Sequence, residues 1–354
     1  MRLMNNRAPC TLYDVARAAG VSTATVSRVM HGQAGVRSTI RQHVLEVIEE
    51  LGYVPDGAAQ SMALHRKEVI GLVSIESRGP ETEIEQEGLL FIEEVFRGVE
   101  TALSQLGWSV LISVITEADR PGVYRRLQKV SAKVDGMLIA EGMASSDELA
   151  LLAARVPIVL VAGAAGEPHA DVVCVDNWSG ATALVRHLLE DHGRKRLFYV
   201  SGPAEAPDAQ ERRRALEEAV ARQPGAVLAG CFEGRFAAIS GQLAVREILA
   251  APRRELPDAI VCGNDQMAIG AMSELQAAGI RVPADIAVVG FDDIHLGAMV
   301  TPRLTTVRQS MRLLGERACA LLLDRIAEPA AARRLERLPT ELIVRESCGC
   351  PPRA

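Results

Sequence analysis

The pattern of apolar and polar positions changes near residue 68 of this 354-residue chain. Before that point the chain shows short amphipathic segments, which are interrupted at Gly20 and again over 31–35. Beyond it, short continuous apolar runs alternate with longer amphipathic stretches. This change predicts two domains, a small helical module over residues 1–67 and a larger body over residues 68–354.

The body alternates between two kinds of segment. Its apolar runs predict buried strands at 69–75, 108–115, 136–142, 157–163, 197–202, 227–232, 259–263 and 286–291. Its amphipathic stretches predict helices near 93–106, 121–133, 145–155, 179–192, 209–222, 237–250, 265–278 and 310–327. Continuous apolar strands separated by helices indicate parallel sheets covered on both faces. The predicted fold class is therefore α/β, with two Rossmann-like lobes because one small sheet does not need so many units.

Residues 11–30 carry the features of a helix-turn-helix. Thr11 is placed to cap a first helix, with Asp14 in its first turn, and Gly20 supplies the left-handed turn that ends it. Ser22 then caps a second helix. The apolar residues whose spacing would pack the two helices together are Val15, Ala16, Ala19, Val26 and Val29. A plain helical hairpin is the alternative, but caps, turn glycine and apolar spacing agree over twenty residues.

The second helix presents short polar residues and one arginine on its outer face. These residues are Thr23, Ala24, Thr25, Ser27 and Arg28. Short side chains let a helix enter the major groove, where Arg can pair with guanine and Ala or Thr can touch a thymine methyl group. The module is therefore predicted to bind DNA.

Composition and charge support this division of the chain. Hydrophobic residues make up 48% and aromatic residues 3%, which favours aliphatic α/β layers. Residues 1–67 hold eight Lys or Arg and five Asp or Glu, a net charge of +3, whereas the whole chain carries −6. A basic module on an acidic body suits DNA contact by the module alone. The chain shows neither a long apolar run nor a signal-peptide pattern, so a cytoplasmic protein is expected.

The seven cysteines are dispersed, which favours reduced thiols in a cytosolic protein. Only Cys348 and Cys350 are closely spaced. Because no histidine or second cysteine pair follows nearby in sequence, we expect incidental tail thiols, with metal or redox sensing as the alternative. His187 and His192 are expected to be ordinary helix-end residues, and neither a metal site nor a cofactor is predicted.

Two other classes of protein have a similar body. An enzyme is one, but the sequence contains no dinucleotide, P-loop, nucleophile-elbow or H-E-x-x-H motif, so no catalytic residue is predicted. A stand-alone sugar-binding protein of the periplasmic type is the other. Neither class would carry a DNA-reading helix-turn-helix.

Several segments found in order along nearly the whole chain resemble the LacI/GalR family of repressors. They include TLYDVARAAGVSTATVSRVMHG, VDNWSGATALVRHLLEDHGRKRLFYVSGP, CGNDQMAIGAMSELQAAGIRVPADIAVVGFDD and PRLTTVRQSMRLLGERA. The resemblance implies a transcriptional regulator that binds a near-palindromic operator as a homodimer and whose two-lobed, periplasmic-binding-protein-like domain binds a small-molecule effector. A repressor is expected, with a corepressor-dependent or activating member as the alternative.

The resemblance also implies DNA-contacting positions. Backbone or base contacts are expected from Tyr13, Ser22, Thr25, Ser27 and His31, and base reading from Thr23, Ala24 and Arg28. Residues 56–64 match the hinge helix that enters the minor groove, with Met62 where a leucine is usual. Asp56 replaces a usual asparagine, so weaker hinge folding is expected.

The effector is expected between the lobes, at the carboxyl ends of the strands. The residues implied as contacts are Arg212, Phe236, Asn264, Asp265, Asp292 and Asp176. Carboxylates that accept hydroxyl hydrogens and an arginine that donates two bonds suit a sugar or sugar acid. The alternatives are that Asp265 and Asp292 cap helices, that Arg212 lies on a solvated face and that Phe236 is a core residue.

One segment departs from the family pattern. Residues 76–91 form a longer, acidic loop where family members have a short one. Its two interpretations are a solvated loop and a site reshaped for an unusual or cationic ligand.

Overall fold

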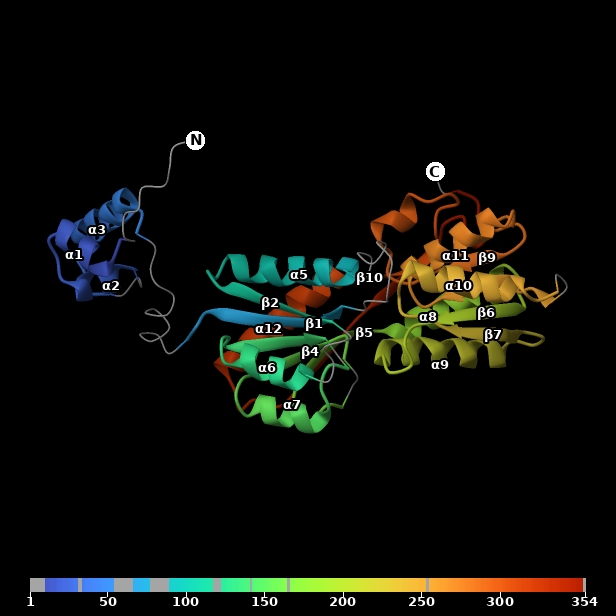
Figure 1. Cartoon of the computed structure of the whole chain (residues 1–354), viewed down its shortest axis with the longest axis horizontal. Coiled ribbons are helices and arrows are strands. Elements are labelled where there is room, and N and C mark those ends of the chain that lie inside the picture. Colours follow the sequence, from blue (N-terminus) through green and yellow to red (C-terminus); the bar gives the residue numbers. More distant parts are fainter. Residues whose placement is uncertain are drawn as a thin grey trace. The chain divides into compact units, whose positions relative to one another are not determined.

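The computed structural model describes residues 10–30, 34–53, 66–76, 89–116, 122–140, 142–163, 166–252 and 255–352. Its internal contacts divide the chain into two compact units, Met1–Lys67 and Glu68–Ala354 (Figure 1). The predicted hinge helix and most of the acidic loop lie outside the described residues. None of the described helices is long and apolar enough to cross a membrane.

The described residues of the first unit form the helices α1 (Leu12–Ala18), α2 (Thr23–Met30) and α3 (Ser38–Leu51). Thr11 and Asp14 form the reciprocal capping box of α1, and Gly20 takes the left-handed backbone at φ +64°. The small core is made by Val15, Ala16, Ala19, Val26, Val29, Val44 and Val47. The predicted helix-turn-helix packing is therefore confirmed, with α3 completing its core.

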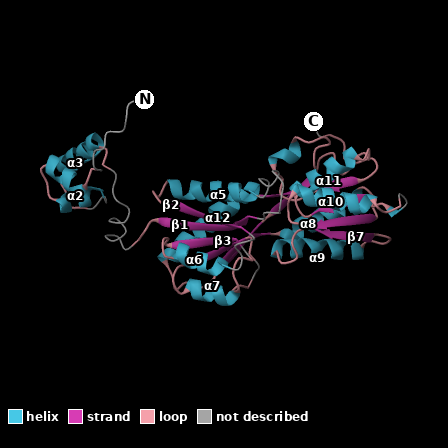
Figure 2. Ribbon diagram, in the orientation of Figure 1, coloured by secondary structure: helices cyan, strands magenta, loops and turns pink. Residues whose placement is uncertain are grey.

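The first lobe of the second unit is built on a six-stranded parallel sheet of order β11-β5-β4-β3-β1-β2. Its strands are β1 (Val69–Glu76), β2 (Ser109–Thr116), β3 (Gly136–Ala140), β4 (Ile158–Val161), β5 (Asp171–Val175) and β11 (Leu335–Leu338). Its helices are α5 (Leu89–Ser104), α6 (Val123–Ser131), α7 (Ser146–Ala153) and α12 (Met311–Ala327). Helices α5 and α12 cover one face, and α6 and α7 the other, each over its own apolar core (Figure 2).

The second lobe has a four-stranded parallel sheet of order β7-β6-β8-β9. Its strands are β6 (Arg196–Ser201), β7 (Val227–Glu233), β8 (Ala259–Cys262) and β9 (Ala287–Val289). Its helical segments are α8 (Asn177–Arg186), the π-helix η3 (His187–Asp191), α9 (Pro207–Arg222), α10 (Ala238–Leu249), α11 (Asp265–Ala277) and the 3-10 helix η5 (His295–Ala298). Helices α8 and α9 cover one face and α10 and α11 the other. The α/β class with two lobes is confirmed.

The chain passes between the lobes after β5, after β10 (Thr306–Gln309) and after β11. Strand β10 pairs antiparallel with β12 (Thr340–Ile343) beside α8. The sequence pattern did not predict β5, β10, β11 or β12. Strands β10, β11 and β12 are four residues long with polar residues among the apolar ones, so they lack the apolar run that marked the others.

A buried ion pair joins the end of α12 to the first lobe's sheet. The Arg325 guanidinium donates two bonds of 2.8 Å to the Asp171 carboxylate, and their side chains are 2% and 0% exposed. Further guanidinium bonds reach the carbonyl oxygens of Ala331 and Ala332, while the Arg334 backbone N–H donates to Asp171. Both charges are thus saturated with partners, as a buried pair requires.

Replacing Arg325 with Leu should therefore lower the free energy of unfolding by about 3–5 kcal/mol, because it leaves Asp171 buried without its counter-charge. Denaturant unfolding of the purified variant measures this loss. Arg281→Ala is the matched control, since the Arg281 side chain that pairs with Asp285 is 74% exposed. A loss for Arg325→Leu no larger than that of the control would contradict the structural role of the pair.

Candidate DNA-binding face and effector site

Helix α2 has one buried side and one accessible side. Val26 and Val29 face the core, whereas Ala24 and Arg28 are exposed. Thr23, Thr25 and Ser27 are half-buried along the margins of that face. The predicted base-reading residues therefore share an accessible side of one helix.

The residues flanking α2 support the same face. The Ser22 hydroxyl accepts a bond of 3.2 Å from the Thr25 backbone N–H, so the predicted cap is present. The Tyr13 side chain is 76% exposed on α1. His31 and Met62, the other predicted DNA contacts, lie outside the described residues.

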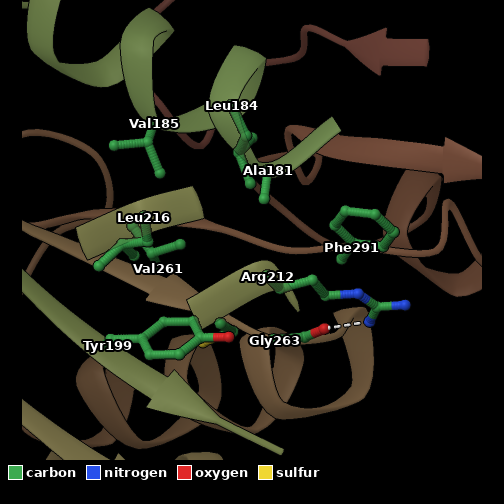
Figure 3. A pocket seen from close by; sticks show the side chains of 10 residues that line it. Ala181, Leu184, Val185, Tyr199, Arg212, Leu216, Val261, Gly263 and Phe291 are labelled. Atoms are coloured by element: carbon green, nitrogen blue, oxygen red, sulfur yellow. Dashed lines mark hydrogen bonds between the residues drawn. The ribbon is translucent and has the colours of Figure 1, made fainter. Parts of the chain in front are cut away.

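In the second lobe, Arg212 of α9 is almost fully buried, at 3% exposed. Its Nε donates to Asn177 Oδ1 at 2.7 Å, and its Nη1 donates to the Gly263 carbonyl oxygen at 2.6 Å. Its Cζ lies 3.8 Å from the centroid of the Phe291 ring, a cation–π contact. Figure 3 shows the guanidinium and this ring together, with the bond to Gly263.

Arg212 also lies near two carboxylates. Its Nη2 is 3.4 Å from Asp208 Oδ2, and its Nη1 is 3.9 Å from Asp292 Oδ1. The next residue, Arg213, is instead 49% exposed and pairs with Glu217. The alternative of a solvated face is therefore wrong for Arg212, because only its neighbour faces solvent.

Asp292 follows β9 and is 8% exposed, in the left-handed backbone region at φ +124°. The Gln309 side-chain amide donates to its Oδ1, and its own backbone N–H donates to the Val307 carbonyl oxygen at 2.7 Å. Burial raises the pKa of its carboxyl, and the Arg212 charge and the Gln309 bond lower it, which leaves a pKa of about 7. Asp292 does not cap the following short helix η5, whose N-cap is Ile294.

Asn264 and Asp265 open α11 after β8 and have different surroundings. Asn264 caps the helix by accepting from the Met267 N–H at 3.0 Å, and its amide donates to the Phe236 carbonyl oxygen at 2.9 Å. Asp265 is 0% exposed and accepts from the Thr306 hydroxyl and from the Ile294 N–H. Burial raises the pKa of Asp265 well above its usual value. Both carboxylate oxygens of Asp265 thus accept from protein donors. The bond from Thr306 holds β10, the strand after which the chain passes to the first lobe, against the start of α11.

The two remaining predicted residues follow strands of different sheets, Phe236 after β7 of the second lobe and Asp176 directly after β5 of the first. Phe236 is half-buried at φ +61°, and its ring lies against Gly202, where an added Cβ would come within 2.1 Å of the ring's Cζ. Asp176 caps α8, because its Oδ1 accepts from the Ser179 N–H at 3.1 Å. Phe236 is linked to Asn264, and Asp176 adjoins the asparagine that holds Arg212.

The sequence did not indicate the residues that hold Arg212 and Asp292 in place. These are Asn177, Asp208, Phe291 and Gln309. Asn177 is 35 residues from Arg212 along the chain, and Gln309 is 17 residues from Asp292. These four residues lie within or beside the segments that resemble the family. That position marks them as candidates, but it does not show which side chains contact each other.

A small cavity lies behind Arg212, with a volume of about 10 Å³. Figure 3 shows Leu184, Val185, Leu216 and Val261 on the side away from the guanidinium. The Tyr199 hydroxyl at this cavity is buried without a hydrogen-bond partner among the described residues. The volume suits one water molecule, so this cavity is too small for an effector.

The tail cysteines have neighbours that the sequence did not reveal. Cys348 lies 3.3 Å from His187 Nε2, and Cys350 lies 3.4 Å from His192 Nε2, measured from each sulfur. The prediction of incidental tail thiols considered neighbours in sequence only, whereas the fold places two histidines beside them. The histidines precede the cysteines by more than 150 residues, and only folding of the tail onto the second lobe brings them together.

Comparison with known proteins gives the family. The protein-family model described as "Bacterial regulatory proteins, lacI family" matches residues 11–56. A second family model, described as "Periplasmic binding protein-like domain", matches residues 185–348. The ribose operon repressor of Escherichia coli (strain K12) is 34% identical over 95% of this chain and 99% of its own. The HTH-type transcriptional repressor PurR of Aliivibrio fischeri (strain ATCC 700601 / ES114) is 32% identical over 95% and 98%.

Solved structures of similar regulators support the same family assignment. A lac repressor dimer bound to operator and the anti-inducer ONPF has a TM-score of 0.83 at 28% identity, covering 96% of this chain and 99% of that one. A CelR–cellobiose complex has a TM-score of 0.68 at 30% identity with the same coverage. The chain belongs to the lacI family of bacterial regulatory proteins. It is a DNA-binding transcriptional regulator controlled by a small-molecule effector, and the curated relatives named above are repressors rather than enzymes.

The pKa of Asp292 predicts a pH-dependent stability. Its folded pKa of about 7 lies above the ordinary value of 3.8, so the folded protein binds more protons than the unfolded chain between these values. The Asp292 contribution should therefore make the free energy of unfolding fall as pH rises from about 4 to about 7. Asp292→Asn should flatten this dependence, as measured by denaturant unfolding at several pH values.

The exposed carboxylate of Asp147 provides the matched control, because Asp147→Asn changes a side chain on the surface of the first lobe. Its pH profile should follow that of the unmodified protein. An Asp292→Asn profile that also follows it would show that the buried carboxyl does not titrate in this range.

Proposed function

We propose that this regulator is a cytoplasmic homodimeric repressor whose effector is a sugar or sugar acid bound between the lobes of its second unit. The observation that carries the proposal is the buried guanidinium of Arg212, fixed by Asn177 and Gly263 beside the Asp292 carboxyl. A fixed donor beside a carboxyl acceptor is the pair that orients vicinal hydroxyl groups. The CelR–cellobiose complex and the ribose operon repressor among its relatives support a sugar.

The proposed contact set is Arg212, Asp292, Phe236 and Asp176, and Asn264 supports it by bonding to the Phe236 carbonyl oxygen. Arg212 and Asp292 bind hydroxyl or carboxylate groups, and the Phe236 ring offers an apolar face for a sugar ring. Asp176 is half-buried, so its carboxylate can accept a hydroxyl at the rim. Asp265 is left out, because its oxygens already accept from Thr306 and Ile294.

Arg212→Ala should abolish the response to effector and leave operator binding intact. The effector is first identified by thermal melts against sugars, sugar acids, sugar phosphates, purines and polyamines, since a ligand at 100 times its Kd adds about 2.7 kcal/mol. The adjacent, exposed Arg213→Ala is the matched control and should keep the melt shift. Loss of the shift in both variants, or in neither, would contradict the assignment, and a shift only with polyamines would favour the acidic loop instead.

The DNA-binding part of the proposal assigns base reading to α2. Arg28 is exposed on the face opposite Val26 and Val29, beside Ala24. Two such helices in a two-fold dimer would read two half-sites about one helical turn of DNA apart. Effector binding would then change operator affinity through the lobes, typically by about 5–150-fold. The direction of that change distinguishes an induced repressor from a corepressor-dependent one.

Arg28→Ala should weaken binding to an operator selected from random DNA by about 1–3 kcal/mol and relax specificity at one position. Fluorescence anisotropy across salt concentrations measures both effects. A uniform loss for all sequences, with the salt slope reduced by about one, would instead assign Arg28 to a phosphate and contradict base reading.

A further inference from the structure

Four metal-binding side chains meet at one end of the second lobe. His187 and His192 lie at the start and just beyond the end of the π-helix η3, whereas Cys348 and Cys350 lie in the tail that follows β12. One ligand atom from each residue lies within 4.8 Å of all the others. Two imidazoles and two thiols form the donor set of a structural zinc site.

The distances fit a single tetrahedral ion. With zinc bonds of about 2.05 Å to nitrogen and about 2.3 Å to sulfur, a tetrahedron has edges of about 3.3 Å between nitrogens and about 3.6 Å between nitrogen and sulfur. The two Nε2 atoms of His187 and His192 are 3.2 Å apart. From His187 Nε2, the sulfurs of Cys348 and Cys350 lie at 3.3 and 3.8 Å, and Cys350 Sγ lies 3.4 Å from His192 Nε2. These are four of the six edges, and the other two, from Cys348 Sγ to Cys350 Sγ and to His192 Nε2, are no longer than 4.8 Å. Shifts of about 1 Å in the side chains would close the site around the ion.

The backbone is shaped to bring these side chains together. Gly349, between the two cysteines, has φ +116°, which a residue with a side chain rarely adopts. A Cβ at this position would also come within 3.2 Å of His192 Nδ1. Gly193 turns the chain directly after His192 at φ +63°. Both glycines therefore let the tail lie closely against the end of η3.

Neighbouring groups orient the ligand atoms. Asp191 Oδ2 lies 2.8 Å from His187 Nδ1, which directs the opposite nitrogen, Nε2, toward the cysteines. The Thr305 hydroxyl donates to Cys348 Sγ at 3.2 Å. Carboxylate–histidine pairs and hydrogen bonds to thiolates are the usual supports of zinc ligands.

Burial is graded across the cluster. Cys348 is 0% and His187 is 7% exposed, whereas His192 and Cys350 are half-buried. The inner pair is thus excluded from water, and the outer pair leaves a path by which an ion enters. The cluster is also separate from the effector site, because Asn177 and His187 are ten residues apart on a continuous helical segment, or about 15 Å.

We propose that this regulator binds one Zn²⁺ through His187 Nε2, His192 Nε2, Cys348 Sγ and Cys350 Sγ. Each thiol releases its proton to solvent when the ion binds, so two thiolates neutralise the charge of the ion. The ion then joins the C-terminal tail to the end of η3 and stabilises the second lobe.

The first measurement is the metal content of the full-length protein, purified under reducing conditions without chelator. Mass spectrometry of the metals should find one zinc per chain. X-ray absorption at the zinc edge should show two sulfur ligands near 2.3 Å and two nitrogen ligands near 2.0–2.1 Å. Protein made metal-free should recover the same spectrum when zinc chloride is added.

The second measurement compares ligand variants by zinc titration of metal-free protein against a chromophoric chelator. Cys350→Ser and His192→Gln change the half-buried ligands, and circular dichroism checks that each variant folds. Each should weaken zinc affinity by at least about 100-fold, because loss of a supporting residue alone typically costs 10–100-fold. Cys231→Ser, an exposed cysteine of the same lobe, and His169→Gln of the first lobe are the matched controls and should bind as the unmodified protein does.

Three results would overturn the proposal. One is reduced, metal-free protein that shows no saturable binding of zinc chloride. Another is an affinity of Cys350→Ser equal to that of Cys231→Ser. The third is a Cys348–Cys350 disulfide in the freshly purified protein that dithiothreitol reduces without creating a zinc site.

Discussion

The proposed effector site depends on the burial of one positive charge. A guanidinium inside a protein costs several kcal/mol unless partners surround it. Arg212 finds its partners at the start of α8, at the end of β8 and after β9, so these three segments must converge around it. This convergence places Asp292 beside the charge, and Gln309 ties that carboxyl to the segment that crosses into the first lobe. The proposed effector contacts and the link between the lobes therefore share one network of hydrogen bonds.

The buried polar groups of this body have two different roles. Arg325 with Asp171 is a saturated pair with short bonds and almost no exposure, which suits a group that fixes structure. Asp265 is engaged in the same way by protein donors. Arg212 and Asp292 are 3.9 Å apart at their charged atoms, and the Asp292 carboxyl has a pKa of about 7. This looser pair is the one with bonding capacity left for a ligand.

Much of the fold could be predicted from the sequence, because the spacing of apolar residues indicates which positions are buried. The apolar runs marked the central strands, and the caps and Gly20 marked the helix-turn-helix. Strands such as β11 and β12 were missed, since short strands with mixed polarity carry little periodic signal. Contacts between side chains far apart in the sequence could not be predicted either. Arg212 was identified by its place in a motif, but its bond to Asn177 and the meeting of Cys348 with His187, 161 residues apart, depend on tertiary folding.

In the proposed mechanism, occupancy of the Arg212–Asp292 site is coupled to operator binding. Coupling between two sites is reciprocal, so effector and operator must change each other's affinity by the same factor. Isothermal titration of the identified effector into free protein and into the protein–operator complex tests this most directly. We predict two effector affinities whose ratio equals the ratio of operator affinities without and with effector. Equal effector affinities in the two titrations would contradict the account.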